Sequence, residues 1–269
     1  MEISGLNTPQ APTWCPGCGN FGILAAIKTS ISELELDPRC VVLAGDVGCS
    51  GKLPFWINTN GFTGLHGRVI ALAQGIKMGN PKLTVLASGG DGGIYGEGIN
   101  HLISAARRNI DITVIVHNNF VYGLTTGQYS PTSRRGFKTK ASPEGSFESP
   151  INPLQLALVS GASFVARGFA GDIQYLSSII KAAILHPGFA LVDILQPCVT
   201  FNREQTSEYY KERVYKLEES NYQPKTIGEA IEKAGEWLPG NETSEVIKIP
   251  TGIFYKDIRE AFPLKELAL

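Results

Sequence analysis

Residues 82–130 read KLTVLASGGDGGIYGEGINHLISAARRNIDITVIVHNNFVYGLTTGQYS, and this stretch decides the fold of the chain. An apolar strand, LTVLAS, runs directly into a glycine-rich turn at residues 89–93. A helix is expected at residues 98–108, and a second apolar strand, ITVIV, ends at His117-Asn118-Asn119. Strand, glycine turn, helix and strand make one unit of an open parallel sheet, and such sheets bind ligands at the carboxyl ends of their strands.

A residue with a hard oxygen ligand follows each of these two strands. Asp91 lies in the glycine-rich turn, and Asn119 lies at the end of the second strand. Mg²⁺ prefers such oxygens and often shares its coordination shell with phosphate. The glycines let backbone N–H groups approach an anion, and the following helix adds its positive end. The pattern indicates a pyrophosphate–Mg²⁺ site; the alternative is an Asp turn and an Asn-rich loop in an unrelated doubly wound fold.

The composition excludes several classes of protein. A chain of 269 residues with 43% hydrophobic residues is large enough for one α/β domain or two small ones. Its 24 basic and 25 acidic residues give a net charge of −1 without a basic stripe, so nucleic acid is not an expected partner. The N-terminus does not resemble a signal peptide and no apolar run is long enough to span a bilayer, so a cytoplasmic protein without a membrane partner is expected.

Strands alternate with helices along the rest of the chain. Strands are expected near residues 40–45, 163–167 and 189–195, and helices near 21–33, 64–81, 153–160 and 172–186. This alternation predicts an α/β fold with a doubly wound, mostly parallel sheet of roughly five or six strands. Residues 1–202 are expected to form this domain, and residues 203–269 a C-terminal appendage with two helices and a short extended piece. The long irregular segment at 120–152 indicates a functional loop.

Four of the five cysteines lie in predicted turns. Cys15 and Cys18 share a CPGC turn, whereas Cys49 and Cys198 follow the ends of strands. Cys40 begins a strand and is expected to be a small core residue. Without a secretion signal, metal-binding or catalytic thiols are favoured over disulfides. Four thiolates suit a [4Fe–4S] cluster or a structural Zn²⁺, and spacing alone does not separate these two.

The sequence GDG, followed one helix and one strand later by NN, resembles the thiamine diphosphate motif. This resemblance implies that Asp91, Asn119 and the backbone carbonyl of Val121 hold Mg²⁺. Thiamine diphosphate forms an electron-rich carbanion–enamine, which a nearby redox cluster can oxidise and zinc cannot. A thiamine site beside the cysteines therefore favours the [4Fe–4S] cluster.

Motifs along nearly the whole chain resemble the β subunit of 2-oxoacid:ferredoxin oxidoreductases. They include WCPGCGNFGI, GDVGCSGK, LHGR, GGDGG, VYGLTTGQYSPTS and LQPCVTFN, in the order found in that family. The resemblance implies that the cluster ligands are Cys15, Cys18, Cys49 and Cys198. It implies thiamine diphosphate contacts at Val47, Gly48, Cys49, Ser50, His66, Gly67, Gly90, Gly92, Gly93, Gly123, Leu124 and Thr125.

Two further residues are candidates for catalysis. His66 precedes a predicted helix, where a lone histidine is often structural, but it lies beside the other turns. Lys52 follows Cys49 and is placed to meet a substrate carboxylate, unless it is an exposed loop lysine. The chain also departs from its relatives, which often have Asp at the position of Gly93 and Lys or Gly at that of Thr126. The second departure leaves the preferred acid side chain open.

The family resemblance implies oxidative decarboxylation of a 2-oxoacid to CO₂ and an acyl-CoA, with coenzyme A as co-substrate and electrons passing through the cluster to ferredoxin. Pyruvate, 2-oxoglutarate and related acids remain open as substrates. The Glu that faces the aminopyrimidine comes from a separate domain in this superfamily, so an α (or fused γα) subunit is the expected partner. Two alternatives are a thiamine-dependent decarboxylase or acetolactate-synthase-like enzyme with zinc or free thiols, and an electron-transfer or scaffold subunit with a decayed GDG site.

Overall fold

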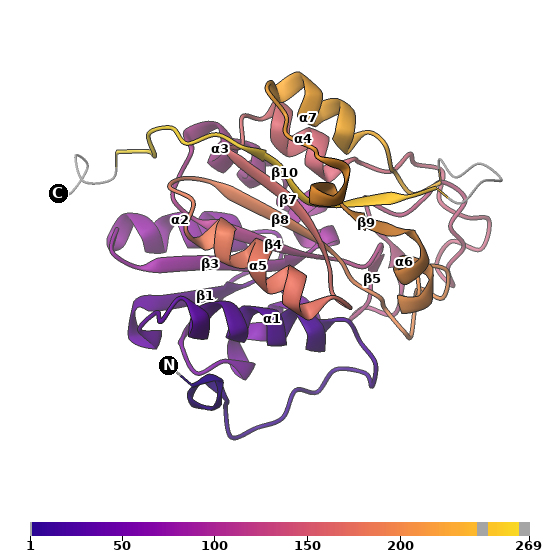
Figure 1. Cartoon of the computed structure of the whole chain (residues 1–269). Helices are drawn as coiled ribbons and strands as arrows, with labels where there is room; N and C mark the ends of the chain where they lie inside the picture. Colours follow the sequence, from indigo (N-terminus) through magenta and orange to yellow (C-terminus); the bar gives the residue numbers. More distant parts are fainter. Residues whose placement is uncertain (1, 241–246, 264–269) are drawn as a thin grey trace.

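The computed structural model describes residues 2–240 and 247–263. An eight-stranded sheet forms its centre (Figure 1). The strands lie in the order β2 (Asn60–Thr63), β1 (Val41–Gly45), β3 (Thr84–Gly90), β4 (Thr113–Asn118), β8 (Ala190–Leu195), β7 (Phe164–Phe169), β10 (Ile249–Lys256) and β9 (Val214–Lys216). Every neighbouring pair is parallel except β7 with β10, so the predicted α/β fold with a mostly parallel sheet is confirmed.

Helices cover both faces of this sheet (Figure 1). One face packs against α1 (Asn20–Glu33) and α5 (Ile173–Ile184). The other face packs against α2 (Val69–Gly79), α3 (Ile99–Arg108), α4 (Pro153–Val159) and α7 (Ile227–Ala234). Further elements, besides a π-turn described below, are η1 (Ile3–Leu6), η2 (Pro38–Cys40), η3 (Ser50–Trp56), α6 (Ser207–Arg213), η5 (Leu217–Ser220) and a small hairpin of β5 (Val121–Tyr122) with β6 (Gln128–Tyr129).

Strands β4, β7 and β8 are buried along their whole length and mostly apolar, because both faces of the sheet are covered. In β4, Val114 and Val116 belong to the core cluster beneath α2 and α3, while Ile115 belongs to the cluster beneath α1 and α5. Successive side chains of a strand point to opposite faces, so a run without polar alternation requires two helical layers. The doubly wound architecture therefore follows directly from the sequence of this strand.

A turn of π-helix, η4 (Gly92–Glu97), lies between β3 and α3. The sequence predicts a helix from residue 98, and α3 begins at Ile99, but nothing in the residue pattern predicts the π-turn that precedes it. A Cβ atom on Gly92 would overlap the ring of Tyr122. The glycine thus lets the hairpin after β4 close over the turn after β3, and this closure builds one wall of the site described below.

The C-terminal part of the chain extends the sheet. Strand β10 pairs with β7 in antiparallel register, and β9 pairs with β10. Leu217, Ala230 and Phe254 from this segment are buried in the same core cluster as the helices α2 and α3. The sheet therefore has more strands than the five or six predicted from the sequence, because the tail contributes two. Residues 241–246 and 264–269 of the expected appendage lie outside the described residues.

Two local predictions need correction. Cys40 is exposed at the end of η2, because the strand begins one residue later at Val41, so the expectation of a core cysteine is wrong. Strand β2 has no counterpart in the sequence prediction, because all four of its residues are exposed and its sequence, NGFT, has no apolar pattern. It joins the sheet only by backbone pairing with β1.

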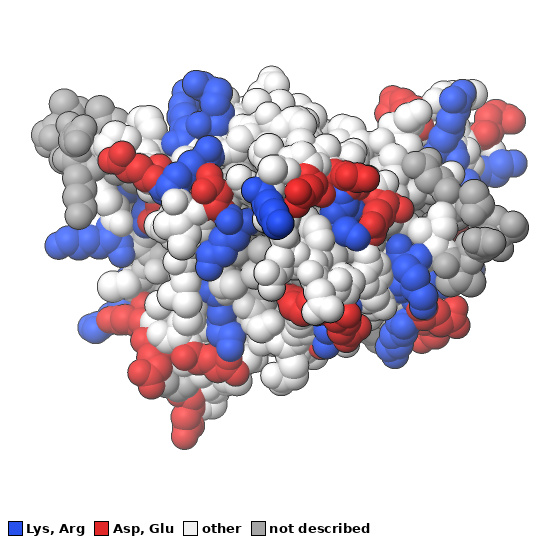
Figure 2. All heavy atoms as spheres, turned by 45° about the horizontal axis from the view of Figure 1, so that its top comes forward, with Lys and Arg blue, Asp and Glu red and all other residues white. Residues whose placement is uncertain are grey.

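The surface carries charges of both signs. On the face shown in Figure 2, Lys and Arg side chains are interspersed with Asp and Glu side chains, and this fits the net charge of −1. Within residues 2–240 and 247–263, no helix combines the length and the apolar character needed to cross a membrane.

Candidate functional site

A cavity lies at the carboxyl ends of β1, β3, β4 and β8, the edge where open parallel sheets bind ligands. It is lined by Val47, Gly48, Cys49, Ser50, His66, Gly90, Asp91, Gly92, Gly93, His117, Asn119, Val121, Tyr122, Gly123, Leu124, Thr125 and Gln196. The structure thus brings together all of the residues expected to contact thiamine diphosphate except Gly67, which lies beside the cavity. Most of these residues lie in the segments that follow β1, β3 and β4, while Gly90 ends β3 itself and His66 lies just before α2.

Glycines bring the backbone close to the cavity. Gly48 has a φ of 112°, a backbone conformation that residues with a side chain rarely adopt. A Cβ atom on Gly93 would overlap a carboxylate oxygen of Asp46. Exposed N–H groups in such turns make concave sites for anions, so this end of the cavity is suited to a diphosphate.

Asp91 is buried at the start of the π-turn, with 1% of its surface exposed. Its Oδ2 atom accepts hydrogen bonds from Ser130 Oγ at 2.5 Å and from Thr132 Oγ1 at 2.8 Å. Burial raises the pKa of Asp91 to about 6, although these two hydroxyls oppose the shift. A cation beside the carboxylate would offset the cost of burying its charge, so Asp91 fits the role of a metal ligand.

Asn119 and Val121 lie against the same cavity. The side-chain oxygen of Asn119 accepts a hydrogen bond from the Val121 N–H at 3.1 Å, and Phe120 between them has a φ of 61°. This left-handed residue turns the chain so that both neighbours face the cavity. Asp91, Asn119 and Val121 therefore line one cavity from two adjacent strand ends, and they carry oxygen atoms of the kind that Mg²⁺ binds.

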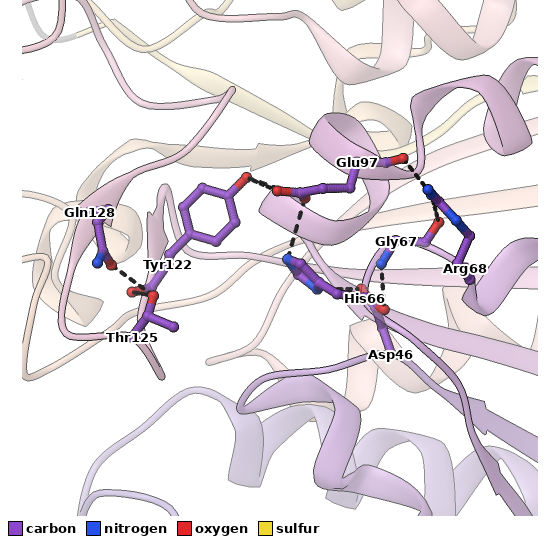
Figure 3. A network of polar contacts seen from close by, with 8 residues as sticks. All are labelled: Asp46, His66, Gly67, Arg68, Glu97, Tyr122, Thr125 and Gln128. Carbon is purple, nitrogen blue, oxygen red and sulfur yellow. Dashed lines mark hydrogen bonds and ion pairs between the residues drawn. The ribbon is translucent and has the colours of Figure 1, made fainter.

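His66 lies between two carboxylates, one buried and one exposed (Figure 3). Its Nδ1 atom is 3.5 Å from Asp46 Oδ2, and its Nε2 atom is 3.3 Å from Glu97 Oε2. Burial raises the pKa of Asp46, while His66 and the N–H groups of Val47 and Gly67 oppose this shift. Because two acids hold its ring from opposite sides, His66 is placed in the cavity wall with a defined orientation.

Lys52 does not line the cavity. It is half-buried in η3, near enough to Cys49 for its charge to lower the pKa of that thiol, although burial, the larger effect, raises it. The predicted contact between Lys52 and a substrate carboxylate therefore stays a prediction.

The four cysteines of the predicted cluster line a second, smaller cavity. This cavity shares Cys49, Asn119, Gly123 and Gln196 with the first one, so the two are adjacent. Burial raises the pKa of Cys18 to about 11, and the other three thiols add to the shift, so all four are close enough to interact. Cys40, the fifth cysteine, is not among the lining residues.

Hydrogen-bond donors reach two of the four sulfur atoms. Gln196 Nε2 lies 3.4 Å from Cys18 Sγ, and Thr200 Oγ1 lies 3.2 Å from Cys15 Sγ. Trp14 donates from Nε1 to the carbonyl of Cys49 at 2.7 Å and closes one side. Among the described residues, no three His, Cys, Asp or Glu side chains have the arrangement of a single-ion site. Four thiols that line one cavity, two of them with a hydrogen-bond donor at the sulfur, fit a cluster, in which each thiolate binds a different iron atom.

Several residues of the site were not among those expected from the sequence, although Ser130 and Thr132 lie in the motif VYGLTTGQYSPTS. Ser130 and Thr132 lie in the long loop, 39 and 41 residues from the carboxylate that they hold. His117 is fully buried, 2.7 Å from Asn20 Oδ1 and 3.0 Å from Ser88 Oγ, and burial lowers its pKa to about 3. It is therefore a neutral, hydrogen-bonded part of the cavity wall.

A buried ion pair lies behind the site. Arg167 Nε is 3.4 Å from Asp193 Oδ2, and both side chains are almost completely buried. Asn118, next to the candidate ligand, donates to Asp193 Oδ1 at 3.1 Å. The guanidinium of Arg167 lies over the ring of Trp237 at 5.1 Å, and Trp237 in turn packs against Phe120. The C-terminal segment thus supports the loop that carries Asn119.

Two family models match the chain. The model for "Thiamine pyrophosphate enzyme, C-terminal TPP binding domain" matches residues 46–194. The model for the C-terminal part of the "Pyruvate ferredoxin oxidoreductase beta subunit" matches residues 198–265. The first model spans the turns that build the larger cavity, and the second begins at Cys198. The first match thus agrees with a thiamine site at the larger cavity.

Curated relatives and a solved structure resemble the chain over most of its length. The 2-oxoacid:ferredoxin oxidoreductase subunit beta of Saccharolobus solfataricus is 51% identical, with 91% of this chain and 81% of the relative covered. Subunit beta of 2-oxoacid:ferredoxin oxidoreductase 1 of Aeropyrum pernix is 47% identical, with 98% and 82% covered.

The solved structure is a 2-oxoglutarate:ferredoxin oxidoreductase from Magnetococcus marinus with 2-oxoglutarate, coenzyme A and succinyl-CoA bound. It matches with a TM-score of 0.92 and 35% identity, covering 99% of this chain and 89% of that chain. The agreement extends from the sheet to the strand-end turns and the C-terminal segment. The chain belongs to the family of β subunits of 2-oxoacid:ferredoxin oxidoreductases.

Proposed function

We propose that this β subunit, with an α subunit, oxidises a 2-oxoacid to CO₂ and an acyl-CoA, with ferredoxin as the electron acceptor. The observation that carries the proposal is the shared wall between the two cavities, in which Cys49 lines both. Decarboxylation and electron removal require a thiamine site and a redox site in close proximity.

The larger cavity is proposed to hold thiamine diphosphate and Mg²⁺. Asp91, Asn119 and the carbonyl of Val121 would hold the metal, and the turns at residues 47–50 and 90–93 would hold the diphosphate. Ser130 and Thr132 keep the Asp91 carboxylate in a fixed orientation by donating to its Oδ2 atom. His66 and Tyr122 form the wall nearest to the exposed Glu97.

The smaller cavity is proposed to hold a [4Fe–4S] cluster on Cys15, Cys18, Cys49 and Cys198. When bound, thiamine diphosphate supplies carbanion chemistry and the cluster supplies one-electron transfer. Trp14 covers the smaller cavity, and Gln196 donates toward Cys18 in its wall. The donors Gln196 and Thr200 would stabilise negative charge on the sulfur atoms of Cys18 and Cys15.

The α subunit is proposed to cover the mouth of the larger cavity. Val47 and Leu124 line this cavity and yet are 42% and 48% exposed. Leu65, beside His66, is 78% exposed. Apolar side chains at a cavity mouth favour a protein partner over water. The division into a domain at residues 1–202 and an extension at 203–269, and the cytoplasmic location, stay predictions.

The test is an anaerobic assay of the isolated chain and of its complex with the α subunit. We expect 2-oxoacid-dependent viologen reduction only from the complex, and an iron-containing, brown β subunit. Pyruvate, 2-oxoglutarate and a branched-chain 2-oxoacid are compared, because several relatives, such as the 2-oxoglutarate oxidoreductase subunit KorB of Mycobacterium tuberculosis, are named for 2-oxoglutarate. Full activity of the chain alone, or a complex inactive with every 2-oxoacid, would refute the proposal.

A further inference from the structure

Asp46 is a buried acid that no part of the thiamine or cluster assignment uses. It follows β1 directly and is 1% exposed. Its Oδ2 atom faces Nδ1 of His66 at 3.5 Å, and within the described part of the chain neither atom has a hydrogen-bond partner. A buried carboxylate oxygen without a partner is costly, so two such groups facing each other indicate an interaction that closes by a small movement.

The carboxylate of Asp46 occupies the space above Gly93. A Cβ atom at position 93 would overlap Asp46 Oδ2 and would lie 3.2 Å from Cε1 of His66. An acidic side chain at position 93 would therefore bring its carboxylate to the same side of the imidazole ring. In this chain the acid beside His66 comes from the end of β1, and Gly93 leaves the space for it.

The surrounding contacts fix the carboxylate in place. The N–H of Gly67 donates to Asp46 Oδ1 at 2.8 Å, and Gly67 has a φ of 69° that favours glycine (Figure 3). On the other side of the ring, Glu97 accepts from the hydroxyl of Tyr122 at 3.2 Å. The ring of Tyr122 lies edge-on to His66, with 6.1 Å between the centroids. The ring of His66 therefore has Asp46 beside its Nδ1 atom and Glu97 beside its Nε2 atom, with the ring of Tyr122 packed edge-on against it.

We propose that Asp46 is the positioning residue of His66 and that an acidic side chain at position 93 substitutes for it. This inference rests on the proposed place of His66 in the thiamine cavity. An acid bonded to one ring nitrogen fixes the ring plane and determines which nitrogen carries the proton toward the cavity. The two positions are therefore interchangeable as sources of the acid but cannot both carry it, because their side chains overlap.

Three variants of the β subunit in complex with its α subunit test this inference. Asp46→Ala removes the acid and lowers kcat by about tenfold or more, the range expected when the partner of a functional histidine is lost. Gly93→Asp forces two acids into one space and also lowers kcat. The double variant, Asp46→Ala with Gly93→Asp, restores the acid from the other element and recovers most of the activity. A merely structural Asp46 would make the double variant the worst of the three.

A second readout does not depend on turnover. Diethyl pyrocarbonate modifies free imidazole nitrogens, and peptide mass spectrometry gives the rate at each histidine. In the cofactor-free complex, Asp46→Ala raises the rate at His66 by at least about threefold, because the ring loses the acid that covers one nitrogen. The double variant returns this rate to near the wild-type value. His101, half-exposed on α3, is the internal control and reacts equally in all variants.

The two readouts separate the possible failures. If the wild-type complex turns over no 2-oxoacid, the proposed function is wrong, while the modification rates still test the role of Asp46. If Asp46→Ala does not fold, Asp46→Asn replaces it as the single variant only, since its neutral amide still accepts the Gly67 N–H but would overlap a side chain at position 93. A double variant that shows no recovery in either readout overturns the inference.

Discussion

At the scale of single residues, Asp91 connects two segments of the cavity wall, the turn after β3 and the loop after β6. Its carboxylate comes from the turn after β3, and the hydroxyls that hold it come from the loop after β6. A buried carboxylate with one oxygen held by two donors is fixed in orientation before any ligand arrives. Asp91 therefore offers the cavity a negative charge whose orientation is fixed by Ser130 and Thr132.

Asp91→Asn is expected to weaken Mg²⁺-dependent binding of thiamine diphosphate by at least about tenfold, because even the loss of an outer-shell partner has an effect of this size. Isothermal titration of the cofactor-free complex measures the affinity. Asp257→Asn is the matched control, since Asp257 does not line the cavity. An unchanged affinity in Asp91→Asn would show that the metal is held elsewhere.

Cys198→Ser is expected to remove the cluster while leaving the fold intact, because serine has the size of cysteine but is a poor ligand for iron. Iron analysis and electron paramagnetic resonance of dithionite-reduced protein measure the loss. Cys40→Ser is the control, since Cys40 is exposed and outside the smaller cavity. Equal iron content in the two variants would contradict the proposed ligand set.

At the scale of secondary-structure elements, the packing of the π-turn η4 explains why the sequence after β3 is rich in glycine. It lies beneath the β5–β6 hairpin, and the close approach of Gly92 to Tyr122 leaves no space for a side chain. Gly75, by contrast, lies exposed within α2, and a Cβ atom there would meet nothing within 4 Å. Gly92 is thus required for close packing in η4, whereas Gly75 makes no such contact and only lowers the stability of α2.

Gly92→Ala is expected to lower the thermal midpoint and the affinity for thiamine diphosphate, because either Tyr122 or the π-turn must move. Gly75→Ala, the matched control in α2, is expected to raise stability by roughly 0.5–1 kcal/mol, because alanine favours the helix. Urea titration and thermal unfolding measure both variants. A neutral Gly92→Ala would show that the hairpin is free to shift.

Acid sensitivity is expected at the junction of α5 and β7. His186 is buried with its Nε2 atom 2.7 Å from Ser163 Oγ, and burial lowers its pKa from 6.5 to about 4. The unfolded chain therefore binds one proton more than the folded chain between these two values. Stability contributed by the neutral ring is complete above pH 6.5 and decreases as the pH falls toward 4.

His186→Gln is therefore expected to reduce the loss of stability between pH 7 and pH 5, although it lowers stability at pH 7 through imperfect packing. Urea midpoints of the cofactor-free subunit at the two pH values give the comparison. The same substitution at His101, outside this pocket, is the control. A pH dependence identical to that of the wild type would exclude His186 as a source of acid sensitivity.

At the scale of the whole molecule, the C-terminal segment packs against the turn that carries the candidate metal ligands Asn119 and Val121. Trp237 is 2% exposed, lies over the guanidinium of Arg167 and packs edge-on against Phe120, which precedes Val121 in the cavity wall. The tail is therefore both an extension of the sheet and a support for the turn after β4. A segment remote in sequence is therefore in contact with the turn that carries Asn119 and Val121.

Trp237→Ala is expected to destabilise the subunit by roughly 3–5 kcal/mol, because it leaves a cavity and uncovers a buried cation. It is also expected to weaken thiamine diphosphate binding, since Phe120 loses its support. Chemical unfolding and titration measure the two effects. Phe147→Ala, at a side chain 77% exposed, is the control and changes neither quantity. Weakened stability with normal binding would show that the tail supports the fold alone.

The sequence by itself determined the order of strands and helices around residues 82–130, the glycine turns and the candidate ligands Asp91 and Asn119. It did so because apolar runs, glycines and polar strand ends are local patterns. The β2 edge strand, the pairing of β10 with β7 and the exposure of Cys40 were decided only by the tertiary structure, because backbone pairing leaves no periodic mark and a strand boundary depends on its neighbours. The same holds for Ser130, Thr132 and Asp46. Their roles depend on distances between segments that no local spacing encodes.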